Sequence, residues 1–183
     1  MSTAAAVTDE ALDAALGIGE PGWDPLEPLA PQSMRSFVSG DPSGQRLRVR
    51  YFRRGDDGAL VGRVWFGPDA QGPPGHAHGG SMAAVLDEAM GAGAWLAGHT
   101  VVAARIGVSF RAMLPLGTIA LVETWVESVD GRKVTTRGRL SGPGGDVFAE
   151  SDGLFVAIAL EKFGGLVGHA GALAALGRSN GAP

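Results

Sequence analysis

Residues 80–97 form a long segment whose apolar residues repeat with the period of a helix, and this segment limits the possible folds most. The stripe repeats every three or four positions and consists of Met82, Val85, Leu86, Ala89, Gly93 and Leu96. The opposite side is mostly Ala and Gly, so we expect a helix that is buried nearly all round. The rest of the chain must supply the cover for it.

The segments on either side of this helix have the period of two that indicates β-strands. Before the helix, strands at 45–54 and 59–67 are joined by Asp56-Asp57-Gly58 and predict a hairpin. After the helix, strands are expected at 101–113, 118–129, 133–140 and 147–159. In the first strand we expect a solvated basic face that consists of Arg46, Arg48 and Arg50.

The order of these elements predicts an α+β fold, in which one long central helix is wrapped by a curled antiparallel sheet of five to six strands. The sheet has to curl because it must cover the apolar stripe. It still leaves one side of the helix uncovered, and a second copy of the sheet would cover that side. We therefore predict a homodimer, or a dimer of dimers.

The two ends of the chain differ in composition from the middle. Residues 1–45 predict an N-terminal arm, in which Thr8 caps a short helix. Prolines at 21, 25, 28 and 31 are expected to prevent regular structure up to about residue 33. Residues 46–163 form the predicted domain, and residues 164–183 form a Gly/Ala-rich tail that is expected to be flexible.

Composition excludes several classes of protein. The net charge is −4 and no Lys/Arg-rich run occurs, which argues against general nucleic-acid binding. The chain has no cysteine, which excludes disulfides, thiol nucleophiles and thiolate metal sites. The N-terminus lacks the basic start of a signal peptide, and Asp87 and Glu88 interrupt the longest apolar stretch. We therefore expect a cytoplasmic protein without a membrane span.

The candidate site lies in GPPGHAHGGSMAAVLDEAM, residues 72–90. Gly79 and Gly80 lie where the helix begins, and the first N–H groups of a helix carry the positive end of its dipole without an internal partner. This start either binds a developing oxyanion or is an ordinary glycine loop. Asp87 lies off the apolar stripe, where it is either a general base or nucleophile or an exposed carboxylate paired with Arg.

Helix geometry separates these two features. Asp87 follows Gly79 by eight residues, which is about 12 Å along a helix axis. One substrate carbonyl does not easily reach both groups in the same chain. If they share a substrate, Asp87 must come from the helix of the partner subunit. The site and the homodimer therefore depend on each other.

Three more polar residues lie close to these groups. His78 would position the loop, polarise a substrate carbonyl or cap the helix. His76 and His78 have a weak metal-ligand spacing without a supporting pattern, so we expect no metal site. Glu88 faces a different direction from Asp87 and is expected to have a structural role.

The segment His78-Gly79-Gly80, followed after six residues by Asp87, resembles the signature of hotdog-fold acyl-CoA thioesterases. It is most similar to the PaaI-like group and its mitochondrial acyl-CoA thioesterase branch. The later segments VSFRAMLPLG, VDGRK and AESDGLFV resemble strand signatures of that family in the same order. The resemblance covers about residues 45–163 and implies a hotdog fold, dimerised so that two sites form between the subunits.

The reaction that this resemblance implies is hydrolysis of a fatty-acyl or aryl thioester of coenzyme A, without a cofactor. Asp87 would be the base or nucleophile. The backbone N–H of Gly79, with or without that of Gly80, would polarise the carbonyl, with His78 beside them.

One position departs from the family pattern. The family often has Ser or Thr on the strand after the helix to position the attacking water, and this chain has Ala103 there. Ser109, another polar residue of that strand, would project elsewhere. The alternative function is therefore a non-catalytic acyl-CoA-binding or regulatory hotdog protein.

Basic residues are expected to contact the phosphates of coenzyme A. The candidates are Arg132 and Lys133, and then Arg111, although each is also compatible with a solvated strand charge. The acyl group would lie near Met82, Met90 and Trp95, unless these belong to the core or the interface.

Overall fold

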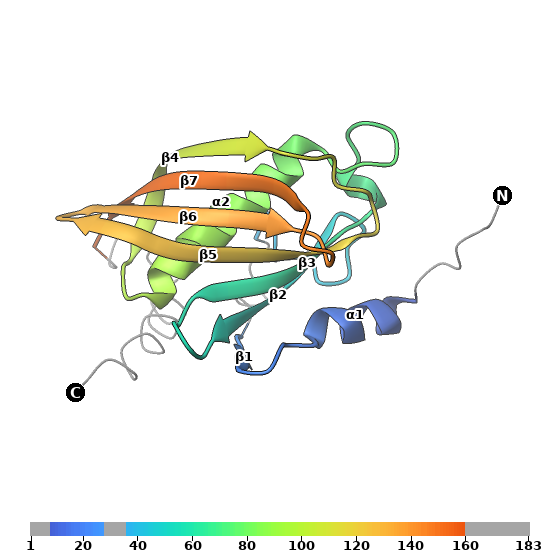
Figure 1. Ribbon diagram of the computed structural model, residues 1–183, viewed down its shortest axis with the longest axis horizontal. Helices are drawn as coiled ribbons and strands as arrows, with labels where there is room; N and C mark the ends of the chain where they lie inside the picture. The colour runs from blue at the N-terminus through green and yellow to red at the C-terminus, as the bar shows by residue number, and fades with distance from the viewer. Residues whose placement is uncertain (1–7, 28–35, 160–183) are drawn as a thin grey trace.

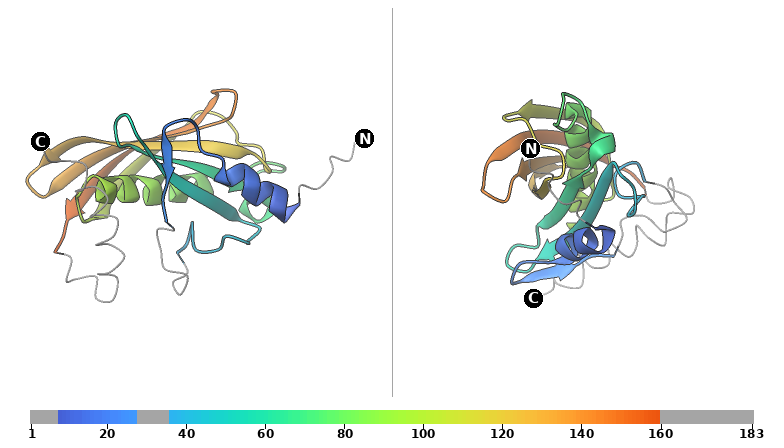
Figure 2. Two further views of the ribbon diagram at one scale, coloured as in Figure 1. Left: turned by 90° about the horizontal axis from the view of Figure 1, so that it is seen from below. Right: turned by 90° about the vertical axis from the view of Figure 1, so that its right-hand side faces the viewer.

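A long helix, α2 (Gly79–Leu96), lies against one face of a seven-stranded antiparallel sheet in the computed structural model, which describes residues 8–27 and 36–159 (Figure 1). The strand order is β1-β2-β3-β5-β6-β7-β4. The strands are β1 (Trp23–Pro25), β2 (Leu47–Arg54), β3 (Leu60–Phe66), β4 (Val101–Phe110), β5 (Ile119–Asp130), β6 (Lys133–Ser141) and β7 (Val147–Ala157). Figure 2 shows the sheet curling around α2, which confirms the predicted α+β layout.

The described residues also contain two shorter helices. α1 (Asp9–Gly17) begins as predicted, since the Thr8 hydroxyl oxygen accepts a hydrogen bond from the Ala11 N–H at 3.3 Å. The other is a 3₁₀ turn, η1 (Pro68–Ala70), that precedes the α2 loop. Within residues 8–27 and 36–159, no helix is long and apolar enough to cross a membrane.

The prediction of five to six strands is wrong by one strand, because the Pro-rich arm contains β1. Pro25 pairs with Phe52 of β2 at the edge of the sheet, where the missing proline N–H costs no hydrogen bond to a further strand. Trp23 packs on Phe52 with ring centroids 5.6 Å apart. Pro28, Pro31 and the predicted tail at 164–183 lie outside the described residues.

The solvated basic face predicted for β2 is also wrong at its centre. Only 1% of Arg48 is exposed, because α1 covers this part of the outer face of the sheet. The guanidinium pairs with Asp9 of α1 at 2.7 Å and lies 5.2 Å from the centroid of the Trp65 ring. The pattern within β2 carries no information about a helix some thirty residues earlier in the chain.

Glycines in the central strands allow the sheet to pack closely on α2. A Cβ atom at Gly138 of β6 would lie 3.1 Å from Leu86 and 3.2 Å from Met90, and one at Gly153 of β7 would lie 3.2 Å from Met90. Leu86 and Met90 are fully buried in this contact. The close approach fixes α2, and with it the candidate site, relative to β6 and β7.

The strand that follows α2, β4, forms one of the two edges of the sheet and pairs with β7 alone among the described strands. Residues 102–105 are exposed, and the register shifts between Ala103 and Arg105. Val102 is 39% exposed and Phe110 is 53% exposed. This edge therefore presents both apolar side chains and unpaired backbone groups.

Candidate functional site

The start of α2 is fastened to the rest of the fold by backbone hydrogen bonds. The His78 N–H donates to the Ala70 carbonyl at 2.7 Å, and the Ala77 N–H donates to the Leu114 carbonyl at 2.8 Å. A Cβ atom at Gly72 would lie 2.7 Å from the Cα atom of His78. The loop needs glycine there because it passes so close to the helix start.

His78 is the N-cap residue of α2. Its Nδ1 atom accepts a hydrogen bond from the Gly80 N–H at 2.8 Å, so the capping role considered for His78 is observed. With Nδ1 as acceptor, the proton of the neutral ring lies on Nε2. The Gly80 N–H is thereby occupied, which weakens its case as a second donor to a substrate carbonyl.

The N–H group of Gly79 has a different environment. In the parts of the chain that the structure describes, it has no hydrogen-bond acceptor. The Phe110 ring of β4 lies against this residue, and a Cβ atom at Gly79 would lie 3.1 Å from its Cζ atom. Gly79 thus combines an unsatisfied donor at the positive end of a helix dipole with close packing under an aromatic ring.

Asp87 lies two turns further along α2 and is half-buried. Burial raises the pKa of its carboxyl group above the ordinary value. Among the described residues, no arginine, lysine or hydrogen-bond donor contacts this carboxylate. The alternative of an exposed aspartate paired with arginine is therefore not what the described residues show.

The direction of Asp87 follows from the contacts of its neighbours on the helix. Leu86 packs on β6 and Met90 on β7, whereas Glu88 accepts a hydrogen bond from Tyr51 of β2 at 3.2 Å. Successive helix residues are turned by about 100°. Asp87 therefore lies on the flank of α2 that faces away from β2 and toward the free β4 edge.

Glu88 has the structural role that was expected, through hydrogen bonds. It accepts from the Tyr51 hydroxyl and also from the Ser36 hydroxyl, which links the N-terminal arm to α2. Desolvation, and then the nearby Glu88 carboxylate, raise the pKa of Tyr51 well above its usual range.

A hollow of 340 Å³ opens beside the helix start. Its lining includes His78 and Gly80 from the start of α2, Leu47 from β2, Ala70 from η1 and Phe37 from the arm. Sequence reasoning did not identify Phe37 as a site residue, because it lies 41 positions before His78 in a segment without a regular pattern. Only the fold brings the two together.

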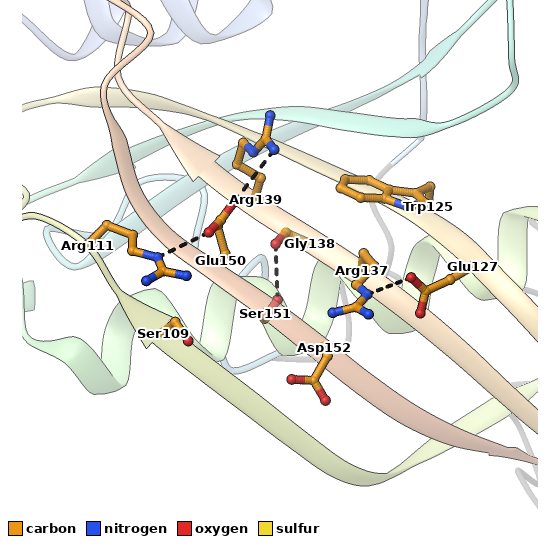
Figure 3. A pocket seen from close by; sticks show the side chains of 10 residues that line it. All are labelled: Ser109, Arg111, Trp125, Glu127, Arg137, Gly138, Arg139, Glu150, Ser151 and Asp152. Atoms are coloured by element: carbon orange, nitrogen blue, oxygen red, sulfur yellow. Dashed lines mark hydrogen bonds and ion pairs between the residues drawn. The ribbon is translucent and has the colours of Figure 1, made fainter.

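A second hollow, of 320 Å³, lies on the outer face of the sheet (Figure 3). The predicted coenzyme A contact Arg111 points into it and pairs with Glu150 at 3.1 Å. The neighbouring Arg137 pairs with Glu127 at 2.9 Å. Ser109 also lines this face, so its hydroxyl is separated from α2 by the sheet.

The other two predicted coenzyme A contacts lie at the β5–β6 turn. Arg132 and Lys133 are exposed, and Arg132 donates from Nε to the Ala157 carbonyl at 3.1 Å. Figure 1 shows this turn beyond the C-terminal end of α2. Within one chain, these residues therefore lie at the opposite end of α2 from Gly79.

No metal site is found within the described residues, where no group of three or more His, Asp or Glu side chains is placed to bind an ion. The Nδ1 atom of His76 lies 2.9 Å from the Pro74 carbonyl oxygen. The Nδ1 atom of His78 is engaged by Gly80. The two histidines therefore direct these nitrogens to different backbone groups.

Comparison with known proteins supports the same fold. The family model of the thioesterase superfamily matches residues 74–149, from the loop before α2 to the start of β7. A crystal structure of a thioesterase superfamily protein has a TM-score of 0.60 and 32% sequence identity, over 65% of this chain and 58% of that chain.

Two curated relatives are acyl-coenzyme A thioesterases. THEM5 of Mus musculus is 34% identical over 102 residues, which cover 52% of this chain and 39% of the relative. THEM4 of Xenopus laevis is 40% identical over 70 residues, which cover 38% of this chain and 32% of the relative. The matches thus span less than half the length of these relatives. The curled sheet around α2 has the hotdog fold, residues 74–149 match the thioesterase superfamily, and parts of the chain are similar to acyl-coenzyme A thioesterases.

Proposed function

We propose that the chain is an acyl-CoA thioesterase that hydrolyses a fatty-acyl or aryl thioester of coenzyme A. The proposal rests on two groups of one helix. The Gly79 N–H has no acceptor among the described residues, and the half-buried carboxylate of Asp87 has no ion-pair or hydrogen-bond partner among them. The first can stabilise an oxyanion and the second can activate a nucleophile. The acyl-CoA thioesterase relatives support the substrate class.

The proposed site forms between two copies of the chain. Antiparallel pairing of two β4 edges about a two-fold axis would place the two α2 helices antiparallel beside each other. With a register in which Phe110 of one copy lies beside the middle of the other copy's β4, Gly79, which lies under Phe110, would come near the middle of the other α2, where Asp87 lies. Asp87 faces that edge. The same pairing would cover the exposed Val102 and satisfy the free backbone groups.

The same dimer would bring the predicted coenzyme A contacts, Arg132 and Lys133, close to the site of the other copy. Lys133, Val156 and Val102 form one row across β6, β7 and β4. Lys133 is thus two strands from the edge, roughly 10 Å. In the proposed dimer, Arg132 and Lys133 of one copy would be near Gly79 of the other and would bind the phosphates of its substrate. Arg111 would bind these phosphates from the outer face of the sheet once its ion pair with Glu150 is broken.

In the proposed reaction, the thioester carbonyl oxygen accepts a hydrogen bond from the Gly79 N–H while water adds to the carbonyl carbon. Asp87 takes the proton from this water, and the tetrahedral intermediate then expels the thiolate of coenzyme A. In the alternative route, Asp87 itself attacks the carbonyl carbon and water hydrolyses the resulting anhydride. Both routes need the ionised carboxylate. His78 keeps the helix start in place by capping it.

The second candidate function is non-catalytic acyl-CoA binding or regulation, and one residue favours it. Ala103, in the irregular part of β4, has no hydroxyl group with which to position a water. Neither candidate requires a cofactor, and the cytoplasmic location stays a prediction from the sequence.

Replacement of Asp87 by Asn tests the two candidates against each other. An amide cannot accept a proton from water, so we expect Asp87→Asn to lower kcat by about 100-fold or more. Thiol release from a panel of acyl-CoA esters measures this. Asp152→Asn, at an exposed aspartate that pairs with Arg105 on the outer face, is the matched control and should retain activity. Full activity of Asp87→Asn would eliminate the mechanism, whereas binding without hydrolysis across the panel would favour the second candidate.

The pH dependence of kcat/KM gives an independent test. Burial raises the pKa of Asp87, so the active carboxylate should become protonated, and activity should fall, at a pH above the ordinary aspartate pKa of about 3.9. The rate of thiol release as pH is lowered measures this acid limb. An acid limb at or below the ordinary value would contradict the assignment of Asp87 as the base.

The Gly79 N–H can be removed with little change of the backbone. Proline is tolerated at the first position of a helix and lacks the N–H group, so Gly79→Pro should lower kcat by about 100-fold to 1000-fold. Gly79→Ala is the matched control, because its Cβ atom meets the same Phe110 ring while it keeps the donor. Equal losses of kcat in the two variants would show that crowding, not loss of the hydrogen bond, is responsible.

A further inference from the structure

We propose that the N-terminal arm forms one wall of the acyl site and that Phe37 sets the length of acyl group that this site accepts. The inference rests on the proposed function, because it places the acyl part of a thioester whose carbonyl binds at Gly79. It assigns a role to residues 36–45 of the arm, which precede the matched thioesterase region.

The first support is the position of the hollow beside the helix start. Its volume, 340 Å³, lies within the range of small-molecule sites. It is lined by His78 and Gly80, the residues on either side of Gly79. A thioester carbonyl bound at the Gly79 N–H would therefore have its acyl group at the mouth of this hollow, next to the apolar side chains of Leu47, Ala70 and Phe37.

The second support is that Phe37 stands between two hollows. A further hollow of 200 Å³ lies beside the first one. The two have a common wall that consists of Phe37, Arg46, Leu47 and Asp69. Leu47 is buried in the core, whereas the Phe37 ring is 74% exposed. The exposed ring is therefore the part of this shared wall that can be shortened without opening the core.

The third support is the way in which the arm is held. Val38 is buried in the core under β2, and the Ser36 hydroxyl donates a hydrogen bond to Glu88 of α2. Glu88 in turn accepts from the buried Tyr51. Both neighbours of Phe37 are thus fixed to elements that carry the site. Phe37 is held at a defined place relative to His78 although its own ring makes little buried contact.

The occupant that these features fit is a short- or medium-chain or aryl acyl group that ends against Phe37. A longer chain would have to displace the ring. Shortening the side chain should join the two hollows and admit longer chains, and enlarging it should do the reverse.

The test compares wild type, Phe37→Ala and Phe37→Trp with butanoyl-, octanoyl-, dodecanoyl- and hexadecanoyl-CoA. We expect Phe37→Ala to raise the ratio of kcat/KM for hexadecanoyl-CoA over butanoyl-CoA by about tenfold or more, and Phe37→Trp to lower it. Ile18→Ala, at an exposed apolar residue after α1, is the matched control and should leave the ratio unchanged. A uniform loss across the series, or an unchanged ratio in both Phe37 variants, would overturn the proposal.

Equilibrium binding of the same four acyl-CoA esters separates this proposal from the proposed function. If the protein binds without hydrolysis, the chain-length preference of Kd should still shift in the Phe37 variants, and the thioesterase proposal alone would fail. If hydrolysis occurs but neither kcat/KM nor Kd changes its chain-length preference, the Phe37 proposal alone fails. If no ester binds to wild type, both fail.

Discussion

The structure depends on packing between the curled sheet and α2, whose large apolar side chains are buried while the flank that carries Asp87 is half-buried among the described residues. Helix α2 is apolar on most of its circumference, and Gly138 and Gly153 leave room for Leu86 and Met90 where the sheet packs on it. The half-buried flank faces β4, and β4 is a free edge with exposed apolar residues. Asp87 thus lies on the side of α2 where, in the proposed dimer, a second copy of the chain would bind.

The start of α2 uses one capping side chain for two neighbouring backbone N–H groups, and only one of them is satisfied among the described residues. Of the first backbone donors of α2, the Gly80 N–H is satisfied by the His78 ring and the Gly79 N–H is left without an acceptor among the described residues. A cap that satisfied both would stabilise the helix but leave no donor for a substrate. The histidine thus stabilises the helix and keeps one donor available. The arm completes this region, because Ser36 and Val38 hold Phe37 beside the same helix start.

Local patterns in the sequence were sufficient for the elements and for part of the site. The helix predicted at 80–97 occupies Gly79–Leu96, and the Thr8 cap is where it was expected. Arg48, β1 and Phe37 were missed for one shared reason. Arg48 is buried by α1, β1 is stabilised by pairing with β2, and Phe37 reaches His78 through the fold. Each depends on a contact between distant segments, and no periodicity within a segment reports such a contact.

In the proposed site, Gly79 and Asp87 act together only across two copies of the chain. Co-expression of Asp87→Asn and Gly79→Pro chains with different tags allows the mixed dimer to be purified. In that dimer one site has both groups intact and the other has neither. The account predicts that each variant alone is nearly inactive and that the mixed dimer recovers about half of the wild-type thiol release, because one of two symmetric sites is restored. A mixed dimer as inactive as its parents would contradict a site shared between subunits.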